Sequence, residues 1–206
     1  MRKVAFLVLV LALAGCGSSK KHAATPPAVA TTSTSPTTTT SSSTSGAGAL
    51  QAEANAAATG DIPDNQVFLV FRNGRAGYSM KYPEGWAQQG TSSSVVFRDK
   101  NNIVRVVVDS GPAPTSAAVQ REVQQLKGAR LVSAPQALSL PSGRAIKVVY
   151  SVSSAANAVT GKRVTLVVDR YYLAERGRRA VVDLGTPRGV DNVDAYRLMI
   201  QSFRWR

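Results

Sequence analysis

Cysteine and histidine are almost absent from this chain of 206 residues, which has one of each, Cys16 and His22. A single cysteine excludes an intramolecular disulfide. One histidine, with neither a second histidine nor an available thiol, supplies too few ligands for a typical metal site. Because His22 lies far from the apolar pattern that begins at Val67, the folded part has no imidazole for Ser-His-Asp or Cys-His catalysis. We expect no metal and no cofactor.

Acidic residues are also scarce. The chain has 12 Asp and Glu against 25 Lys and Arg, and residues 61–206 have 11 against 21, a net charge of +10. Such an excess raises the rate of encounter with anionic surfaces, although a basic face can also serve solubility alone. Nucleic acid fits this charge, but no RNA-binding aromatic signature is present and the N-terminal segment indicates export. We therefore expect no nucleic-acid partner.

Long hydrophobic runs are missing except at the N-terminus. Arg2 and Lys3 precede the apolar run from Val4 to Ala14. This run is about half of the ~20 residues that cross a bilayer, and its flanks are those of a signal peptide. Ala14 and Gly15 stand directly before Cys16, which resembles the lipobox of bacterial lipoproteins. The alternative is an ordinary secreted protein with an unmodified cysteine.

The lipobox resemblance implies a signal peptide over residues 1–15 and a diacylglyceryl group on Cys16, with fatty acyl chains such as palmitate. One acyl chain binds a membrane only reversibly, whereas two anchor it firmly. The resemblance thus implies a lipid-anchored protein on the extracytoplasmic face of the cell membrane. The membrane itself is then the first expected partner.

Residues 16–60 have the composition of a tether. Positions 31–45 contain only Thr, Ser and Pro36. Such a segment cannot bury enough apolar surface to offset the entropy of ordering its backbone, so we expect disorder. The same composition is typical of O-glycosylated stalks. As a random coil it has a reach on the order of 35–40 Å, which separates the domain at 61–206 from the lipid.

Residues 61–206 alternate between strand and helix patterns. Strands are predicted at 67–71, 77–82, 95–98, 103–108, 131–140, 145–150, 163–173 and 180–184, and residues 151–160 are predicted to form a loop. Thr115 is expected to cap a helix that runs to Lys127, with Val119, Val123 and Leu126 on one face. Asp191 is expected to cap a closing helix, with a buried stripe made of Val193, Tyr196, Ile200 and Phe203. Hairpin-linked strands with two helices predict an antiparallel sheet with helices packed on it.

Two segments of this region resemble the PsbP-like (Mog1/PsbP-like) group. They are Gly77-Tyr-Ser-Met-Lys-Tyr-Pro-Glu-Gly-Trp86 and the closing Ser202-Phe-Arg-Trp205. The resemblance covers about Val67 to Arg206 and implies an α+β fold, an α/β/α sandwich on a central antiparallel sheet. Plant members assist the oxygen-evolving photosystem, and most bacterial members lack an assigned activity. No recognisable metal-binding residues carry over, so the resemblance implies no photosynthetic role.

The basic residues suggest one candidate binding region. The candidates lie on either side of the predicted strand at 163–173: Lys162, Arg163, Arg176, Arg178 and Arg179. For a tethered protein, the expected anionic partners are a phosphate-rich wall polymer, a lipid headgroup or an acidic protein. These residues can also lie at opposite ends of that strand.

Carboxylates are the remaining route to catalysis. The acids considered are scattered, with no pair at a telling spacing: Asp99, Asp109, Glu122, Asp169, Glu175 and Asp183. Asp169 and Asp183 are interpreted as cross-strand neighbours, each beside an arginine and therefore in a structural salt bridge. No Gly-rich phosphate loop or dinucleotide fingerprint appears.

The leading hypothesis is a non-catalytic, lipid-anchored extracytoplasmic protein whose domain binds or supports an envelope partner. The alternative is a small carboxylate-dependent hydrolase or wall-modifying enzyme. A deep pocket holding two carboxylates would favour the enzyme, and a shallow basic or apolar face would favour the binding protein.

Overall fold

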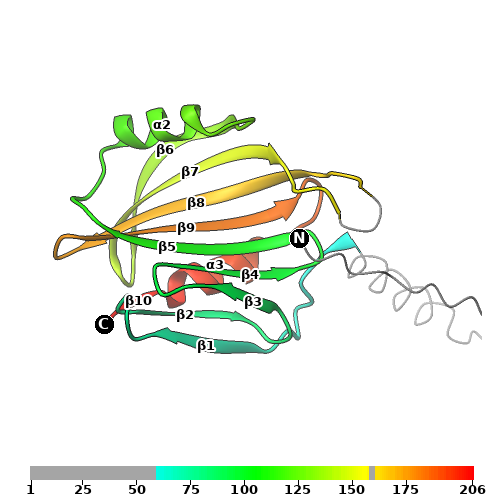
Figure 1. Ribbon diagram of the computed structural model, residues 1–206, viewed down its shortest axis with the longest axis horizontal. Coiled ribbons are helices and arrows are strands. Elements are labelled where there is room, and N and C mark those ends of the chain that lie inside the picture. The colour runs from blue at the N-terminus through cyan, green and yellow to red at the C-terminus, as the bar shows by residue number, and fades with distance from the viewer. Residues whose placement is uncertain (1–58, 158–160) are drawn as a thin grey trace, which may run out of the picture. The chain divides into compact units, whose positions relative to one another are not determined.

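The computed structural model of the chain describes residues 59–157 and 161–206 (Figure 1). The chain divides into two units, Met1–Ser42 and Ser43–Arg206, and the described residues belong to the second. The expected signal peptide, the expected lipidation site Cys16 and nearly all of the expected tether lie outside the described residues. Among the described residues, no helix has both the length and the apolar character needed to cross a membrane.

The strands form two antiparallel sheets. The larger sheet has the order β3-β4-β5-β9-β8-β7-β6 and the smaller one has the order β1-β2-β10. The strands of the larger sheet are β3 (Ala87–Gly90), β4 (Ser94–Asp99), β5 (Asn102–Ser110), β6 (Arg130–Leu140), β7 (Gly143–Ser153), β8 (Thr165–Glu175) and β9 (Arg178–Pro187). Those of the smaller sheet are β1 (Phe68–Asn73), β2 (Tyr78–Pro83) and β10 (Arg204–Trp205).

Two helices cover opposite faces of the seven-stranded sheet. Helix α2 (Ser116–Gln125) lies over β6 and β7, and α3 (Val193–Ser202) lies on the other side, next to the small sheet (Figure 1). Along β8 the faces alternate, because successive side chains of a strand point in opposite directions. Tyr172 packs with the α2 core, whereas Tyr171 and Leu173 pack with the α3 core. The expected α+β class, with helices on both sides of an antiparallel sheet, is confirmed.

The expected antiparallel sheet is the seven-stranded one, and the second, smaller sheet was not predicted. The hairpin of β1 and β2 pairs with the two-residue β10 at the end of the chain, not with the neighbouring β3 and β4. Strand β3, which pairs with β4, was not predicted because its residues Ala-Gln-Gln-Gly have no apolar alternation. Periodicity reveals which residues share a face of a strand, but it does not reveal which strand lies alongside.

The core between the seven-stranded sheet and α3 is rich in aromatic rings. Tyr78 stacks on Phe203 with ring centroids 5.4 Å apart and planes 9° apart, and Tyr82 stacks on Phe97 at 4.3 Å. Phe71 meets the Phe97 ring edge-on at 5.3 Å. The segment 77–86 thus acts as the packing motif that its resemblance implied.

Both helices begin close to their predicted positions. Thr115 is the N-cap of α2, and its hydroxyl accepts a hydrogen bond from the Ala118 amide at 3.2 Å, as expected. The predicted cap of α3 was off by one residue, since Asn192 is the N-cap. Asp191 still accepts a hydrogen bond from the Val193 amide, at 3.1 Å.

The buried stripe of α3 was predicted correctly for Tyr196, Ile200 and Phe203, which are all buried. Val193 was wrongly placed in it, because this residue is 60% exposed at the first turn of the helix. Met199, which the stripe omitted, is fully buried. Strand ends also moved: β7 extends to Ser153, three residues into the predicted loop.

Candidate functional site

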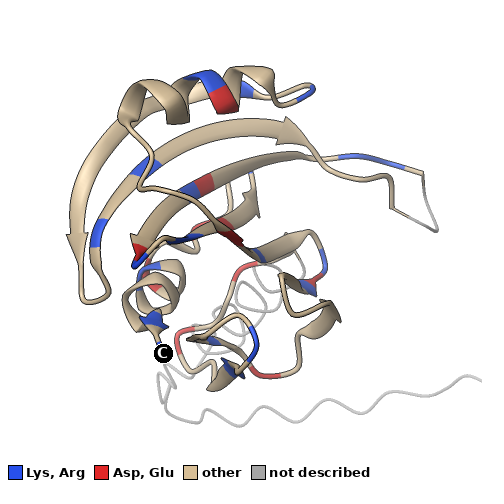
Figure 2. Ribbon diagram, turned by 60° about the vertical axis from the view of Figure 1, so that its left-hand side comes forward, with Lys and Arg blue, Asp and Glu red and all other residues tan. Residues whose placement is uncertain are grey.

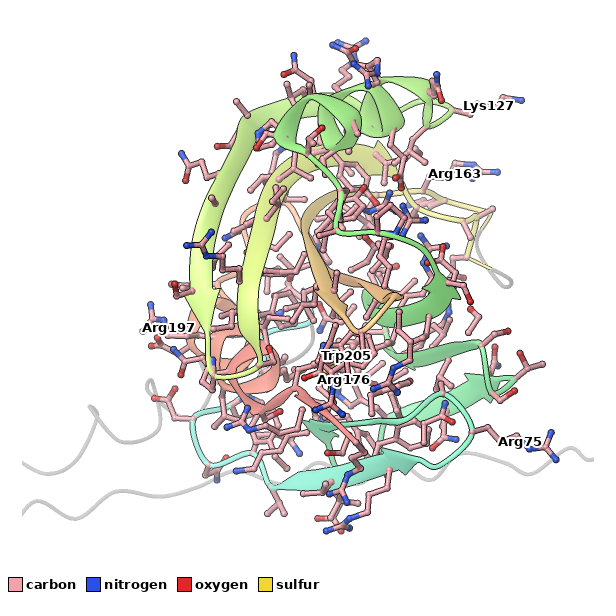
Figure 3. The ribbon with its side chains drawn as sticks, turned by 90° about the vertical axis from the view of Figure 1, so that its left-hand side faces the viewer. Arg75, Lys127, Arg163, Arg176, Arg197 and Trp205 are labelled. Atoms are coloured by element: carbon pink, nitrogen blue, oxygen red, sulfur yellow. The ribbon has the colours of Figure 1, made fainter. Side chains whose placement is uncertain are left out.

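The arginines of the β8–β9 hairpin lie at one end of the domain. Arg176 and Gly177 form the two-residue turn, and both have a positive φ, 49° and 76°. A turn with positive φ at both central residues matches the twist of the strands that it joins, and glycine is well suited to it. Arg176 is exposed at the tip of this turn, close to Trp205 in the view of Figure 3.

Arg178 on β9 links the segment before β2 and the C-terminal residues to the β8–β9 hairpin. Its guanidinium lies 4.8 Å from the ring centroid of Trp205 and donates hydrogen bonds to the carbonyls of Gly77, at 3.2 Å, and Arg206, also at 3.2 Å. It also forms a salt bridge with Glu175 at 3.4 Å. A Cβ at Gly77, whose φ is +68°, would stand 2.1 Å from the Arg178 side chain, so the glycine makes room for it. The first role of Arg178 is therefore structural.

Arg179 is also engaged within the domain. It faces Asp109 across the β5–β9 pair and forms a two-point ion pair with it, Nε to Oδ1 at 3.0 Å and Nη2 to Oδ2 at 2.5 Å. The hydrogen bond from Arg179 to the Asp109 carboxylate stabilises the charged guanidinium and so raises its pKa. Arg75, in the β1–β2 turn, and Arg206 also belong to this end and are exposed.

We call this group the basic end, and its members are Arg75, Arg176, Arg178, Arg179 and Arg206. The acids that contact it, Glu175 and Asp109, neutralise two of the five charges. Lys and Arg elsewhere are distributed over the layers of the domain (Figure 2). The basic end is the place where the structure brings together three of the five candidate residues.

The other two candidates lie at the opposite end of β8. Lys162 and Arg163 precede the strand, which has 11 residues and so spans roughly 35 Å at about 3.3 Å per residue. Arg163 donates a hydrogen bond to the carbonyl of Ser154 at 2.7 Å. The five candidates therefore do not make one site, and their binding of a partner stays a prediction.

A buried group of charges joins α2 to the sheet. Arg170 on β8 and Asp183 on β9 are 2% and 4% exposed and lie opposite each other, with Nε to Oδ1 at 2.6 Å. Arg105 on β5 reaches the same carboxylate at 2.6 Å. From α2, Glu122 accepts hydrogen bonds from Arg170 at 3.3 Å and from the Tyr172 hydroxyl at 3.0 Å.

The electrostatics of this group favour a fixed ion pair. Burial opposes the charge of Arg170, but the hydrogen bond and attraction from Asp183 outweigh it and raise the pKa of the guanidinium further. Burial, with the Asp183 carboxylate nearby, raises the pKa of Tyr150 to about 12. A catalytic acid or base needs a pKa near the working pH, which none of these shifts provides. The predicted structural salt bridge of Asp183 is confirmed.

Asp169 is not the cross-strand neighbour of Asp183, and that prediction was wrong. Asp169 faces Leu184, one register position away, so the two carboxylates point to opposite faces of the sheet. Asp169 forms its own ion pair with Lys147 at 2.6 Å, as expected for a structural role, although the partner is a lysine and not an arginine.

The sequence analysis missed a group of aspartates around the start of α3. These aspartates are Asp61, Asp64, Asp191 and Asp194. Together with the apolar side chains of Ile62, Phe68 and Leu198, they line a hollow of about 720 Å³. Asp194 is paired with Arg197 at 2.9 Å, and Asp64 and Asp191 are exposed. No sequence signal reveals this group, because its members come from segments 130 residues apart that the fold brings together.

A second hollow of about 590 Å³ continues along α3 and has the opposite charge. Lys81, Arg197 and Arg204 line it, with Val70 of β1 and Leu198 as apolar neighbours. Within residues 59–157 and 161–206, no group of three or more metal-ligating side chains has a geometry that would hold an ion.

The chain resembles several solved structures in fold, but comparisons of its sequence find no relative. No protein-family model matches the chain, and no curated protein matches it. Solved structures that it resembles include cyanobacterial PsbP (CyanoP) from Synechocystis sp. PCC 6803, at 16% identity and a TM-score of 0.47, covering 71% of this chain and 98% of that one. The Ran-binding protein Mog1p of Saccharomyces cerevisiae has 12% identity and a TM-score of 0.45, covering 68% and 95%.

A third structure is LpqN of Mycobacterium tuberculosis, described as involved in cell envelope biogenesis. It has 18% identity and a TM-score of 0.38, and the match covers 68% of this chain and 91% of that one. CyanoP and Mog1p are examples of the PsbP-like group that the segments 77–86 and 202–205 resemble. At these identities the likeness concerns the fold alone, and we draw no inference about activity from it.

Proposed function

We propose that this protein is a lipid-anchored extracytoplasmic binding protein, non-catalytic, whose domain binds a phosphate-bearing anion of the envelope through the basic end. The proposal rests on five arginines from three separate segments that lie at one end of the domain, although Arg75 points away from Arg176 in the view of Figure 3. Anchoring through Cys16 rests on the lipobox-like sequence before it.

The chemistry of the basic end suits phosphate. Guanidinium groups present planar, forked donors that match phosphate oxygens, and they stay charged at any physiological pH. Arg178 and Arg179 are held in place by ion pairs with Glu175 and Asp109, which offset their charges, so the net positive charge comes from the other three arginines. Arg75, Arg176 and Arg206 are exposed and available for direct contact. A wall polymer and a lipid headgroup share this phosphate chemistry.

A triple substitution tests the proposal. Detergent-solubilised full chain is titrated with purified phosphate-rich wall polymer and, separately, with micelles containing phosphatidylglycerol. Arg75→Ala, Arg176→Ala and Arg206→Ala together should weaken binding to one of the two by about a hundredfold, since each of the three lost contacts to a charged group contributes roughly 1 kcal/mol.

The matched control removes the same charge elsewhere, through Arg121→Ala, Lys127→Ala and Arg188→Ala, all exposed positions. This control should retain most of the affinity. Equal weakening by both triple variants would mean that net charge alone attracts the partner, and no binding to either anion would refute the proposal. Binding only to an acidic protein would replace phosphate by carboxylate as the ligand.

The anchor has its own test. Replacing Cys16 by serine removes the thiol that lipid attachment requires, so the protein should move from the membrane to the soluble fraction or remain unprocessed. Membrane retention with normal cleavage of Cys16→Ser would contradict lipid anchoring.

A hydrolase is the second candidate, and the aspartate-lined hollow is the observation that favours it. Paired carboxylates can act as general acid and base, although a general acid usually needs burial to raise its pKa. Asp61 is the half-buried member of this group. Release of soluble fragments from wall polymer by the full chain, abolished by Asp61→Asn with Asp191→Asn, would establish the enzyme. No release would leave the binding protein as the better description.

A further inference from the structure

Both edges of the seven-stranded sheet are protected against pairing with another chain. An edge strand offers unpaired backbone groups to other chains, and proteins usually block it with bulges, prolines, charges or short length. Strand β6 is blocked: its pairing with β7 shifts register twice, and Pro135 lies within it. Strand β3, at the other edge of the same sheet, has only four residues.

Strand β1, at the edge of the small sheet, has none of these protections over its first four residues. It pairs with β2 through six consecutive residues without a register shift, and its sequence is Phe-Leu-Val-Phe-Arg-Asn. Leu69 and Val70 are 39% and 44% exposed. In Figure 1, β1 is the outermost strand, with no other strand beyond it.

The hydrogen-bond pattern reveals which residues of β1 offer their backbone to the open side. The Glu84 amide donates to the Val67 carbonyl at 2.8 Å, which makes this a hydrogen-bonded pair. Antiparallel pairs alternate, so Leu69 and Phe71 also bond to β2. Val70 does not, and its partner Lys81 accordingly donates its amide away from β1, to the Ser202 hydroxyl at 2.7 Å.

It follows that the outward-facing amides and carbonyls are those of Phe68, Val70 and Arg72. Among the described residues, no hydrogen bond to any of these backbone groups is present on the open side. They form an equally spaced row centred on Val70. Such a row is complementary to itself when a second copy is turned by 180°.

The charges along β1 favour the same arrangement. Asp64 and the acidic hollow lie before the start of the strand, and Arg72 and Arg75 lie at and beyond its end. Antiparallel pairing of two copies places the acidic start of one next to the basic end of the other. With Val70 opposite Val70 of the second copy, Arg72 at the end of one strand lies opposite Phe68 at the start of the other, toward the acidic segment that precedes it.

We propose that two copies of this protein pair antiparallel through β1, with the two-fold axis at Val70, so that the two small sheets become one of six strands. Phe68 then faces Arg72 of the second copy, and six backbone hydrogen bonds join the strands. The net charge of +10 on each domain opposes association. Salt screens this repulsion, so the pairing should be stronger at physiological salt, where the Debye length is about 8 Å, than at low salt. This proposal does not rest on the proposed function, although both involve Arg75.

Sedimentation equilibrium of the detergent-solubilised full chain tests it. The unmodified chain should contain dimer. Val70→Pro should give monomer, because proline has no amide hydrogen to donate to the second copy. The hydrogen bonds to β2 are kept, since proline is tolerated on an edge strand where the amide faces outward. Val70→Lys, which adds a charge to the edge, is the second disrupting variant should the proline variant fail to fold. Val132→Lys, on the blocked edge β6, should leave the dimer intact.

The position of the two-fold axis is tested by cross-linking. Residues opposite each other in a hydrogen-bonded antiparallel pair have Cα atoms about 5.5 Å apart, within the range for a disulfide. Val70→Cys should therefore form a disulfide-linked dimer in the membrane, above the background that the unmodified chain gives, and Val132→Cys should not. A monomeric unmodified chain, a dimer that survives both Val70 variants, or a dimer without the Val70→Cys cross-link would overturn the proposal.

Discussion

The two faces of the seven-stranded sheet bury different chemistry. On the α3 face, Phe203 and Met199 of the chain's last 10 residues are fully buried among aromatic rings. On the α2 face, the helix buries only Val119 and Val123, and beside them lies the ion pair of Arg170 and Asp183. Both faces are closed, but one is closed by apolar packing and the other in part by charge.

This difference determines how the stability of each face responds to substitution. An apolar contact is non-directional, so truncation costs the lost packing and the cavity that remains. A buried ion pair adds little over well-packed apolar residues, but removal of one partner leaves an unpaired charge in the interior. The α3 face should therefore respond to the volume of a substitution and the α2 face to whether charges remain balanced.

The largest effect is expected from Phe203→Ala. The side chain is fully buried, stacks on Tyr78 and meets Trp205 edge-on at 5.2 Å. Its loss should lower the free energy of unfolding by about 3–5 kcal/mol, a large share of the ~5–15 kcal/mol of a typical domain. Denaturant melts measure this value, and a change below about 1 kcal/mol would mean that α3 is not docked as described.

A slightly smaller loss, about 3 kcal/mol, is expected from Asp183→Ala, because Arg170 keeps Glu122 as a partner. The double variant Arg170→Met with Asp183→Leu should regain most of it, since Arg105, whose side chain is 39% exposed, can turn to water. A double variant as unstable as the single one would show that the ion pair stabilises the fold beyond charge balance.

An intermediate effect depends on pH. Burial raises the pKa of Tyr78, on the α3 face, and of Tyr150, on the α2 face, to about 12 from 10. Above pH 10 the unfolded chain releases these protons while the folded domain keeps them. Each tyrosine therefore lowers the free energy of unfolding by about 1.4 kcal/mol per pH unit up to about pH 12. Tyr150→Phe should flatten this alkaline slope, and an unchanged slope would show that Tyr150 titrates normally.

The smallest effects are expected after α3. Arg204 donates to the carbonyls of Gln201 and Phe203, both at 2.7 Å, and so satisfies acceptors at the helix end. Arg204→Ala should cost about 0.5–1 kcal/mol. Arg206→Ala should stay within about 0.5 kcal/mol, because the contact with Arg178 uses its backbone carbonyl. Melts that rank the two variants in the opposite order would refute this assignment.

Sequence patterns predicted local structure better than neighbours in space. The Thr115 cap, the buried faces of both helices and most strands follow from periodicity and capping chemistry. The second sheet did not, since β10 has only two residues and its pairing with β2 joins positions more than 100 apart. The same limit applies to candidate sites: Arg176 and Arg179 are close in sequence and could be grouped from it, whereas Asp61 and Asp191 are brought together only by the fold.

The point where the chain enters the domain has a mechanical consequence. The Gly60 carbonyl accepts hydrogen bonds from the side chains of Asn102, at the start of β5, and Asn192, at the start of α3, and the Ile62 amide donates to Asn192 at 2.8 Å. A force applied to the chain before Gly60 is therefore distributed between β5 and α3. The domain should therefore resist tension applied through Gly60, and Asn192→Ala should lower the force at which it first unfolds.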